Sequence, residues 1–152
     1  MDAAERHTPV MLDRCVDLLA PALTKPGAVA IDGTLGMGGH TEAILTRCPE
    51  ATVVGIDRDP QAIDLASARL ARFGDRFRAH HAEYDDIAGA LALAGADAAD
   101  GILLDLGVSS LQIDEAERGF SYAQDAPLDM RMNPEDPVSA ADLLRDASQE
   151  EL

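Results

Sequence analysis

An apolar run that passes directly into a cluster of glycines constrains the fold of this chain more than any other stretch. Residues 29–40 read Val-Ala-Ile-Asp-Gly-Thr-Leu-Gly-Met-Gly-Gly-His, and a helical pattern follows them. This order predicts a strand, a tight turn and the N-terminus of a helix. The N–H groups at a helix N-terminus have no partner within the helix and can hold a ligand, and glycine lets that ligand approach closely.

A second apolar run, about one βα unit later, ends in an acid. Residues 51–57 predict a strand that closes with Asp57, 25 positions after Asp32 and 18 after Gly39. In doubly wound sheets, an acid at the end of the second strand accepts hydrogen bonds from ribose hydroxyls. The two segments therefore predict half of an adenosine site. The alternative is a glycine-rich turn that binds nothing.

Asp32, which closes the first strand, bears on the choice of adenosine cofactor. A carboxylate at the glycine turn would repel the pyrophosphate of NAD. The same carboxylate would attract the ammonium of S-adenosylmethionine, which also carries a sulfonium. Asp32 therefore favours S-adenosylmethionine.

Helical and apolar patterns alternate along the first two thirds of the chain. We expect helices over 9–22, with Thr8 as N-cap, and over 39–47, 60–73 and 84–94. We expect strands over 28–32, 52–57, 76–79 and 101–106. This order predicts an α/β fold with a doubly wound parallel sheet. The continuous apolar run at 101–106 is typical of a central strand covered on both faces.

The pattern changes after residue 107. A short helix is expected over 109–116, a proline-rich loop over 119–137 and a helix over 137–145. Residues 148–151 read as a capping box whose helix is missing. Because a doubly wound sheet usually has further strands, we expect these 152 residues to be part of a longer protein, truncated after the fourth strand.

Composition narrows the classes of function. The net charge of −16 repels nucleic acid phosphates and, taken alone, opposes an RNA- or DNA-binding module. Two distant cysteines are typical of free thiols in a reducing cytosol, and no run approaches a membrane span, so a soluble cytoplasmic protein is expected. The four histidines lack the spacing of metal ligands, and no metal site is predicted.

Residues at the carboxyl ends of the strands are candidates for the site, because cofactors of open α/β sheets bind there. Besides the turn and Asp57, these ends carry Tyr84 and Asp105. The ring of Tyr84 could stack on an adenine ring or, alternatively, pack against the sheet at the start of a helix. Asp105 fits the reaction zone or a turn cap. His40 is, by itself, more typical of a capping residue than of a ligand.

Several motifs resemble the bacterial ribosomal small-subunit RNA cytosine-N4 methyltransferase family. They are HTPVML at 7–12, DGTLGMGGHT at 32–41, GIDRD at 55–59, LDLGVSSLQ at 104–112, RGFS at 118–121 and PLDMRM at 127–132. The resemblance implies a class I S-adenosylmethionine fold with a helical domain inserted after strand 4. Residues 1–125 would be the first part of the methyltransferase core, and residues 126–152 the start of the inserted domain.

The resemblance also implies the site residues. The cofactor contacts fall on Gly38, Gly39, His40, Asp57, Tyr84, Asp105 and Gln112. Relatives often have phenylalanine where this chain has Tyr84, and either ring offers a face to adenine. Asp105 is the first candidate for the catalytic residue. Many amine methyltransferases carry an Asn- or Asp-Pro-Pro-aromatic motif after strand 4, and this chain has Asp105-Leu106-Gly107 there, so that motif does not define the proton acceptor.

The reaction implied is methylation of N4 of a cytidine in 16S ribosomal RNA, within the small ribosomal subunit. Formation of a homodimer is also a possibility that the sequence leaves open. Because the net charge opposes RNA binding, we expect a more basic remainder of the protein and little activity of this chain alone. Two alternatives also stay open: a methyltransferase acting on a small molecule or a protein, and a non-catalytic nucleotide-binding or interaction module.

Overall fold

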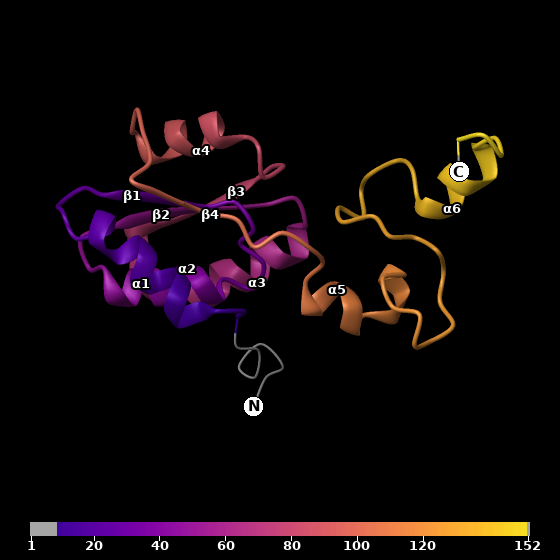
Figure 1. Cartoon of the computed structure of the whole chain (residues 1–152), viewed down its shortest axis with the longest axis horizontal. Helices are drawn as coiled ribbons and strands as arrows, with labels where there is room; N and C mark the ends of the chain where they lie inside the picture. The colour runs from indigo at the N-terminus through magenta and orange to yellow at the C-terminus, as the bar shows by residue number, and fades with distance from the viewer. Residues whose placement is uncertain (1–8, 152) are drawn as a thin grey trace. The chain divides into compact units, whose positions relative to one another are not determined.

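The computed structural model describes residues 9–151 of the chain (Figure 1). The chain forms two compact units, which divide between Leu106 and Gly107. The predicted domain boundary at residue 125 falls inside the second unit, and the assignment of 126–152 to an inserted helical domain stays a prediction. Thr8, the expected N-cap of the first helix, lies outside the described residues.

The first unit alternates helices and strands. Its elements are α1 (Leu12–Leu23), β1 (Val29–Asp32), α2 (Gly39–Arg47), β2 (Thr52–Asp57), α3 (Pro60–Leu70), the 3₁₀ helix η2 (Ala71–Arg76), β3 (Phe77–His81), α4 (Ile87–Ala94) and β4 (Gly101–Leu103). The strands form one parallel sheet of order β3-β2-β1-β4. In Figure 1, α1, α2 and α3 lie on one side of this sheet and α4 on the other. The predicted α/β fold with a parallel sheet is confirmed.

The two inner strands are buried on both faces. Ala30 and Val53 pack in a core that includes residues of α1, α2 and α3. Ile31, Val54 and Ile56 pack in a second core with α4. All five side chains are at most 1% exposed. The alternation follows because successive residues of a strand point to opposite faces, and it explains why these parallel strands are almost wholly apolar.

Helix α3 begins as the sequence predicts. Asp59 is the N-cap, and its carboxylate accepts the Gln61 N–H at 3.0 Å. Pro60 occupies the first helical position, where its missing N–H costs nothing. The regular helix ends at Leu70, and Gly74 breaks the following η2 with a φ of 56°.

Several elements differ from the predictions: the helix expected over 84–94 begins at Ile87 after the N-cap Asp86, and the one expected over 137–145 spans Ala140–Asp146. Helix α1 begins at Leu12 and not at residue 9, because Met11 has a left-handed φ of 52° that cannot continue a right-handed helix. Strand β4 stops at Leu103 and, among residues 9–151, lies at an edge of the sheet, so the expectation of a central strand stays a prediction. Ile102 and Leu104 are each 47% exposed, because within residues 9–106 the only strand that pairs with β4 is β1.

The second unit contains the short helices α5 (Ser110–Asp114), η3 (Ala116–Arg118) and α6 (Ala140–Asp146). Capping boxes at Ser109 and Ser139 start α5 and α6. The buried guanidinium of Arg118 donates to the carbonyls of Arg131 at 3.3 Å and Met132 at 2.8 Å. Arg118 therefore orders the long proline-containing segment that precedes α6.

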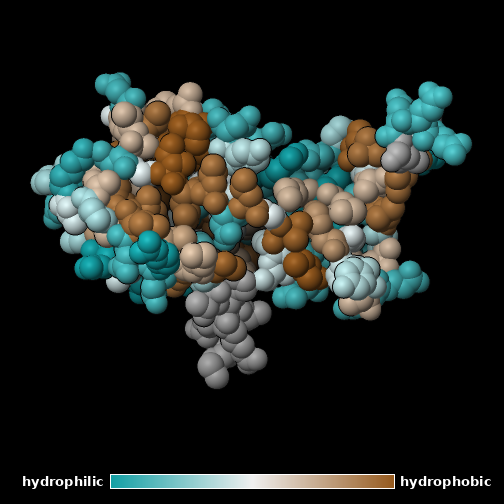
Figure 2. Space-filling view, viewed as in Figure 1, coloured by the Kyte–Doolittle hydropathy of each residue, from teal (hydrophilic) through white to brown (hydrophobic). Residues whose placement is uncertain are grey.

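The surface of the first unit carries exposed apolar side chains. Helix α4 is built from isoleucine, leucine, alanine and glycine alone, and Figure 2 shows hydrophobic side chains over it. No helix among the described residues combines the length and hydropathy that a membrane span needs.

We predict that Arg76 stabilises the end of α2. Its guanidinium donates to three carbonyls at distances between 3.1 and 3.3 Å, those of Leu45, Cys48 and Ala51. Arg76→Met would leave these carbonyls without the donor and lower the free energy of unfolding by about 2 kcal/mol in chemical denaturation. Arg47→Met, at an exposed position in the same helix, is the control and should cost less than about 0.5 kcal/mol. Equal losses in the two variants would contradict the role of Arg76.

Candidate active site

The glycine turn between β1 and α2 has the shape that the sequence predicts. Gly36 has a φ of 50°, and Gly38, the N-cap of α2, has a φ of 79°. A Cβ on Gly38 would lie 2.9 Å from Cδ1 of Leu70 and 3.3 Å from Cβ of Ala66. Glycine is therefore required at 38 both by the backbone and by the packing of α3. The first N–H groups of α2 have no partner within the helix.

Asp57 ends β2 and contacts the turn. Its Oδ2 accepts the Gly36 N–H at 2.8 Å, and its Oδ1 accepts the Asp59 N–H at 2.9 Å. Burial raises the pKa of Asp57 above its ordinary value, and the N–H donors oppose that shift. Each carboxylate oxygen has a further lone pair, so Asp57 keeps the capacity to accept ribose hydroxyls.

Asp32 is buried, with 1% of the residue exposed. Its Oδ2 accepts the Thr41 hydroxyl at 2.7 Å, and its Oδ1 accepts the Thr34 N–H at 3.2 Å. Burial raises the pKa of Asp32, while these two donors lower it. With only 1% of the residue exposed, Asp32 presents almost no carboxylate surface to a ligand, which argues against its pairing with the ammonium of a cofactor. Its carboxylate holds the turn instead.

His40, the second residue of α2, is also buried. Its Nε2 donates to the Val10 carbonyl at 3.0 Å. A Cβ on Gly39 would lie 2.4 Å from Cγ of Pro9, so the segment before α1 lies directly against the turn. Because the imidazole is engaged with this segment, a ligand contact by His40 would come from its backbone N–H.

Tyr84 and Asp105 follow β3 and β4 at the carboxyl edge of the sheet. Tyr84 is 53% exposed, and its carbonyl oxygen lies 3.5 Å from the position of a Cβ on Gly33. The Gly33 N–H donates to the Leu103 carbonyl at 2.9 Å, and the Asp105 N–H donates to Oγ1 of Thr34 at 2.7 Å. These contacts bring the segments after β3 and β4 to the glycine turn.

Gln112 belongs to the second unit. Its side chain is buried, and its Oε1 accepts the Ser109 N–H at 2.9 Å within the capping box of α5. The other predicted contacts gather around the turn in the first unit: Gly38, Gly39, His40, Asp57, Tyr84 and Asp105.

Sequence analysis missed Thr34 and Thr41. The backbone of Thr34 and the hydroxyl of Thr41 hold the two oxygens of Asp32. The sequence feature that could have pointed to these threonines is Asp32 itself, because a carboxylate at the end of a buried strand needs hydrogen-bond donors close by. The sequence offers both threonines near that acid, and only the folded chain shows that they are used.

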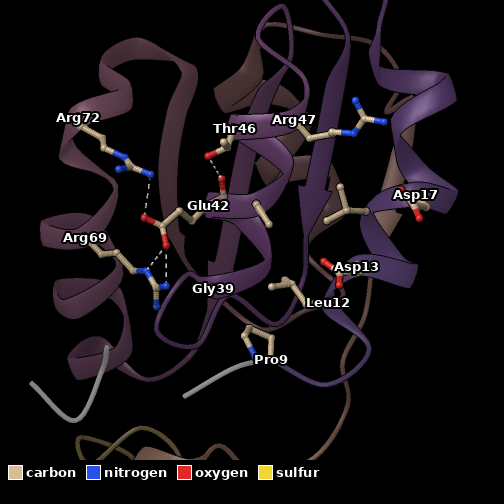
Figure 3. Close-up of a pocket in the computed structure, with 12 residues that line it drawn as sticks. Pro9, Leu12, Asp13, Asp17, Gly39, Glu42, Thr46, Arg47, Arg69 and Arg72 are labelled. Atoms are coloured by element: carbon tan, nitrogen blue, oxygen red, sulfur yellow. Dashed lines mark hydrogen bonds and ion pairs between the residues drawn. The ribbon is translucent and has the colours of Figure 1, made fainter. Parts of the chain in front are cut away.

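A groove of about 920 Å³ lies along α1, α2 and α3 (Figure 3). Figure 3 shows Arg69 and Arg72 converging on Glu42, and the Arg69 Nε lies 2.7 Å from the Glu42 carboxylate. Arg69 also donates to the Met37 carbonyl at 3.5 Å, which links α3 to the glycine turn. The groove shares Gly39 with the predicted cofactor contacts and none of the others, so it is a separate feature.

Comparison with known proteins places almost the whole chain in one family. The family model described as the MraW methylase family matches residues 4–152. A ribosomal RNA small subunit methyltransferase H from Beutenbergia cavernae is 61% identical over 99% of this chain and 45% of its own length. One from Kocuria rhizophila is 59% identical over 99% of this chain and 46% of its own length. The chain thus spans somewhat less than half the length of these curated relatives.

Among solved structures, an rRNA methylase from Streptococcus thermophilus superimposes with a TM-score of 0.44 and 20% identity. The superposition covers 55% of this chain and 45% of that one. At this level the similarity supports no conclusion about the site.

We predict that Asp32 makes stability fall as the pH rises. Because burial raises its folded-state pKa, its protonated form favours folding below the unfolded pKa, and this contribution is lost as the pH rises through the folded value. Asp32→Asn cannot ionise. Its free energy of unfolding, relative to the parent protein, should therefore rise as the pH increases above the ordinary pKa of an aspartate.

Denaturation at a series of pH values measures this difference. Asp64→Asn, at an exposed position on α3, is the control for the loss of a surface carboxylate. If the relative stability of Asp32→Asn fell as the pH rose, the carboxylate would instead be stabilised in its charged form.

Proposed function

Because this chain belongs to the MraW methylase family, we propose that it forms the S-adenosylmethionine-binding part of an enzyme that methylates RNA of the small ribosomal subunit. The observation that carries the proposal is the meeting of the glycine turn with Asp57 and Asp105 at the carboxyl edge of a parallel sheet. The relatives named above are small subunit rRNA methyltransferases, which supports the substrate class. We further propose N4 of a cytidine in 16S ribosomal RNA as the position methylated, on the resemblance of the chain's motifs to the cytosine-N4 methyltransferase family.

The choice of S-adenosylmethionine over NAD rests on the family, since the buried Asp32 presents almost no carboxylate surface to a ligand. A Cβ on Gly36 would meet only the Thr34 carbonyl, at 3.9 Å, so the space beside Gly36 is open.

The proposed contacts divide by the chemistry of the cofactor. Backbone groups of Gly38, Gly39 and His40 would hold the methionine end, as helix N-termini hold carboxylates. Asp57 would accept the ribose hydroxyls, and the exposed ring of Tyr84 would lie on the adenine. Gln112, which belongs to the second unit, is the remaining cofactor contact that the family resemblance implies.

The mechanism assigns Asp105 to the reacting amine. Bound S-adenosylmethionine supplies an electrophilic methyl group on a sulfonium. The lone pair of cytidine N4 is delocalised into the ring, so this amine is a poor nucleophile. The Asp105 carboxylate would accept a hydrogen bond from the N4 amino group, which helps the nitrogen become pyramidal, and would take the proton that N4 loses when the methyl group passes to it and leaves the sulfur as a thioether. The turn and Asp57 would contribute mainly by aligning the methyl donor with the amine. The cytosine must leave its base stack to reach the site.

A methyltransferase acting on a small molecule or a protein is the second candidate, because the net charge of −16 fits it better than RNA. The full-length protein, incubated with tritium-labelled S-adenosylmethionine and undermethylated small subunits, separates the two. Label in the 16S RNA supports the first proposal, and label only in small molecules or protein supports the second.

We predict that Asp57→Asn weakens binding of S-adenosylmethionine by at least about tenfold, because one charged acceptor for ribose is lost. Isothermal calorimetry of the full-length protein measures this, with Asp64→Asn as the control of unchanged affinity. The same titration with NAD should give no heat. Binding of NAD alone would favour a dehydrogenase, and binding of neither cofactor would favour a non-catalytic module.

We predict that Asp105→Ala lowers the turnover of the full-length enzyme by about 100-fold or more if its carboxylate acts on the amine. Asp97→Ala, at an exposed position in the same unit, is the control and should keep the parental rate. Parental turnover of Asp105→Ala at unchanged affinity for S-adenosylmethionine would remove Asp105 from both the catalytic and the binding role.

A further inference from the structure

The hydroxyl of Thr34 joins the two halves of the candidate site. Thr34 belongs to the glycine turn after β1, and its Oγ1 accepts the Asp105 N–H at 2.7 Å. The donor and the acceptor lie 71 positions apart in the sequence. One side chain therefore connects the turn that would bind the cofactor to the acid that would act on the substrate.

This link lies where the connections of the sheet reverse direction. From β1 the chain proceeds outward through β2 to β3, and it then returns to place β4 on the other side of β1. In open α/β sheets, ligands bind at this switch point, beyond the carboxyl ends of the strands. The contact between Thr34 and Asp105 bridges the ends of β1 and β4, the two strands that flank the switch point.

The strand ladder itself does not fix Asp105. The last residue pair of the β1–β4 ladder is Asp32 with Leu103, and β4 ends there. One more hydrogen bond joins the two strands beyond this pair, because the Gly33 N–H donates to the Leu103 carbonyl at 2.9 Å. Beyond this point the bond from the Asp105 N–H to Thr34 continues the connection to the turn.

Thr34 is itself held from the core. Its N–H donates to Oδ1 of Asp32, whose Oδ2 accepts the hydroxyl of Thr41 on α2. A hydrogen-bonded chain thus runs from α2 through a buried carboxylate and Thr34 to Asp105. A hydroxyl both donates and accepts, so Thr34 can accept from Asp105 while its own hydrogen stays directed elsewhere.

We propose that Thr34 is a positioning residue, which sets the place of Asp105 relative to the glycine turn through the Asp105 backbone. This inference rests on the proposed function, because Asp105 has a role only if the protein transfers a methyl group. Thr34 touches neither reacting atom in this account. It acts through Asp105.

Three variants of the full-length protein test the inference. Thr34→Val keeps the branched shape and removes the acceptor, whereas Thr34→Ser keeps the hydroxyl. Thr46→Val makes the same change in α2, where the hydroxyl donates only to the Glu42 carbonyl, and serves as the matched control. Loss of one hydrogen bond predicts a fall of about fivefold in kcat/KM for Thr34→Val. Thr34→Ser should recover most of that loss, and Thr46→Val should match the parent.

Two readouts separate positioning from a general effect on stability. Amide hydrogen exchange at Asp105 should become faster in Thr34→Val and stay slow in Thr34→Ser. In an Asp105→Ala background, Thr34→Val should cause no further loss of kcat/KM or of affinity for S-adenosylmethionine, because effects that act through one residue are not additive. The inference would be overturned if the losses of Thr34→Val and Asp105→Ala added fully in the double variant, or if Thr34→Val alone kept the parental kcat/KM.

The outcome is distinguishable from failure of the proposed function. If the parent protein neither binds S-adenosylmethionine nor methylates RNA, the function fails for every variant alike. If the parent protein does both and Thr34→Val behaves like Thr46→Val, the function stands and the positioning role is wrong.

Discussion

The candidate site depends on a buried acid whose two oxygens both find hydrogen-bond donors. Asp32 ends β1 with 1% of the residue exposed, and an unpaired carboxylate in such a place would cost several kcal/mol. The hydroxyl of Thr41 and the N–H of Thr34 supply the donors. Because Thr41 belongs to α2 and Thr34 to the turn, one carboxylate fixes the strand, the turn and the helix against one another.

The glycine turn is also held from outside by two other segments. On one side α3 packs Leu70 against Gly38, and Arg69 reaches the Met37 carbonyl. On the other side the chain before α1 places Pro9 on Gly39. The turn is therefore rigid before any ligand arrives, and preorganised backbone donors need little rearrangement on binding. Its free side is the edge at which Asp57 and Asp105 meet it.

The positive charges of this chain serve the fold more than a nucleic acid. Arg76 binds carbonyls at the end of α2, and Arg118 binds carbonyls of the second unit. Arg131 pairs with Asp129 in a bidentate arrangement. The net charge of the chain is −16, and these three guanidinium groups are engaged internally. In the proposed enzyme, attraction to RNA phosphates would have to come from other residues.

The sequence by itself determined the strand, turn and helix around the glycines, the position of Asp57 after β2 and the Asp59–Pro60 start of α3, because apolar spacing, glycine conformations and caps are local properties of the chain. Only the tertiary structure decided that β4 pairs with β1 and that Asp32 turns inward to Thr41. It also decided that Thr34 meets Asp105 across 71 positions. The physical reason is that the order of strands and the burial of a side chain depend on which distant segments pack together, and local propensity does not encode that choice.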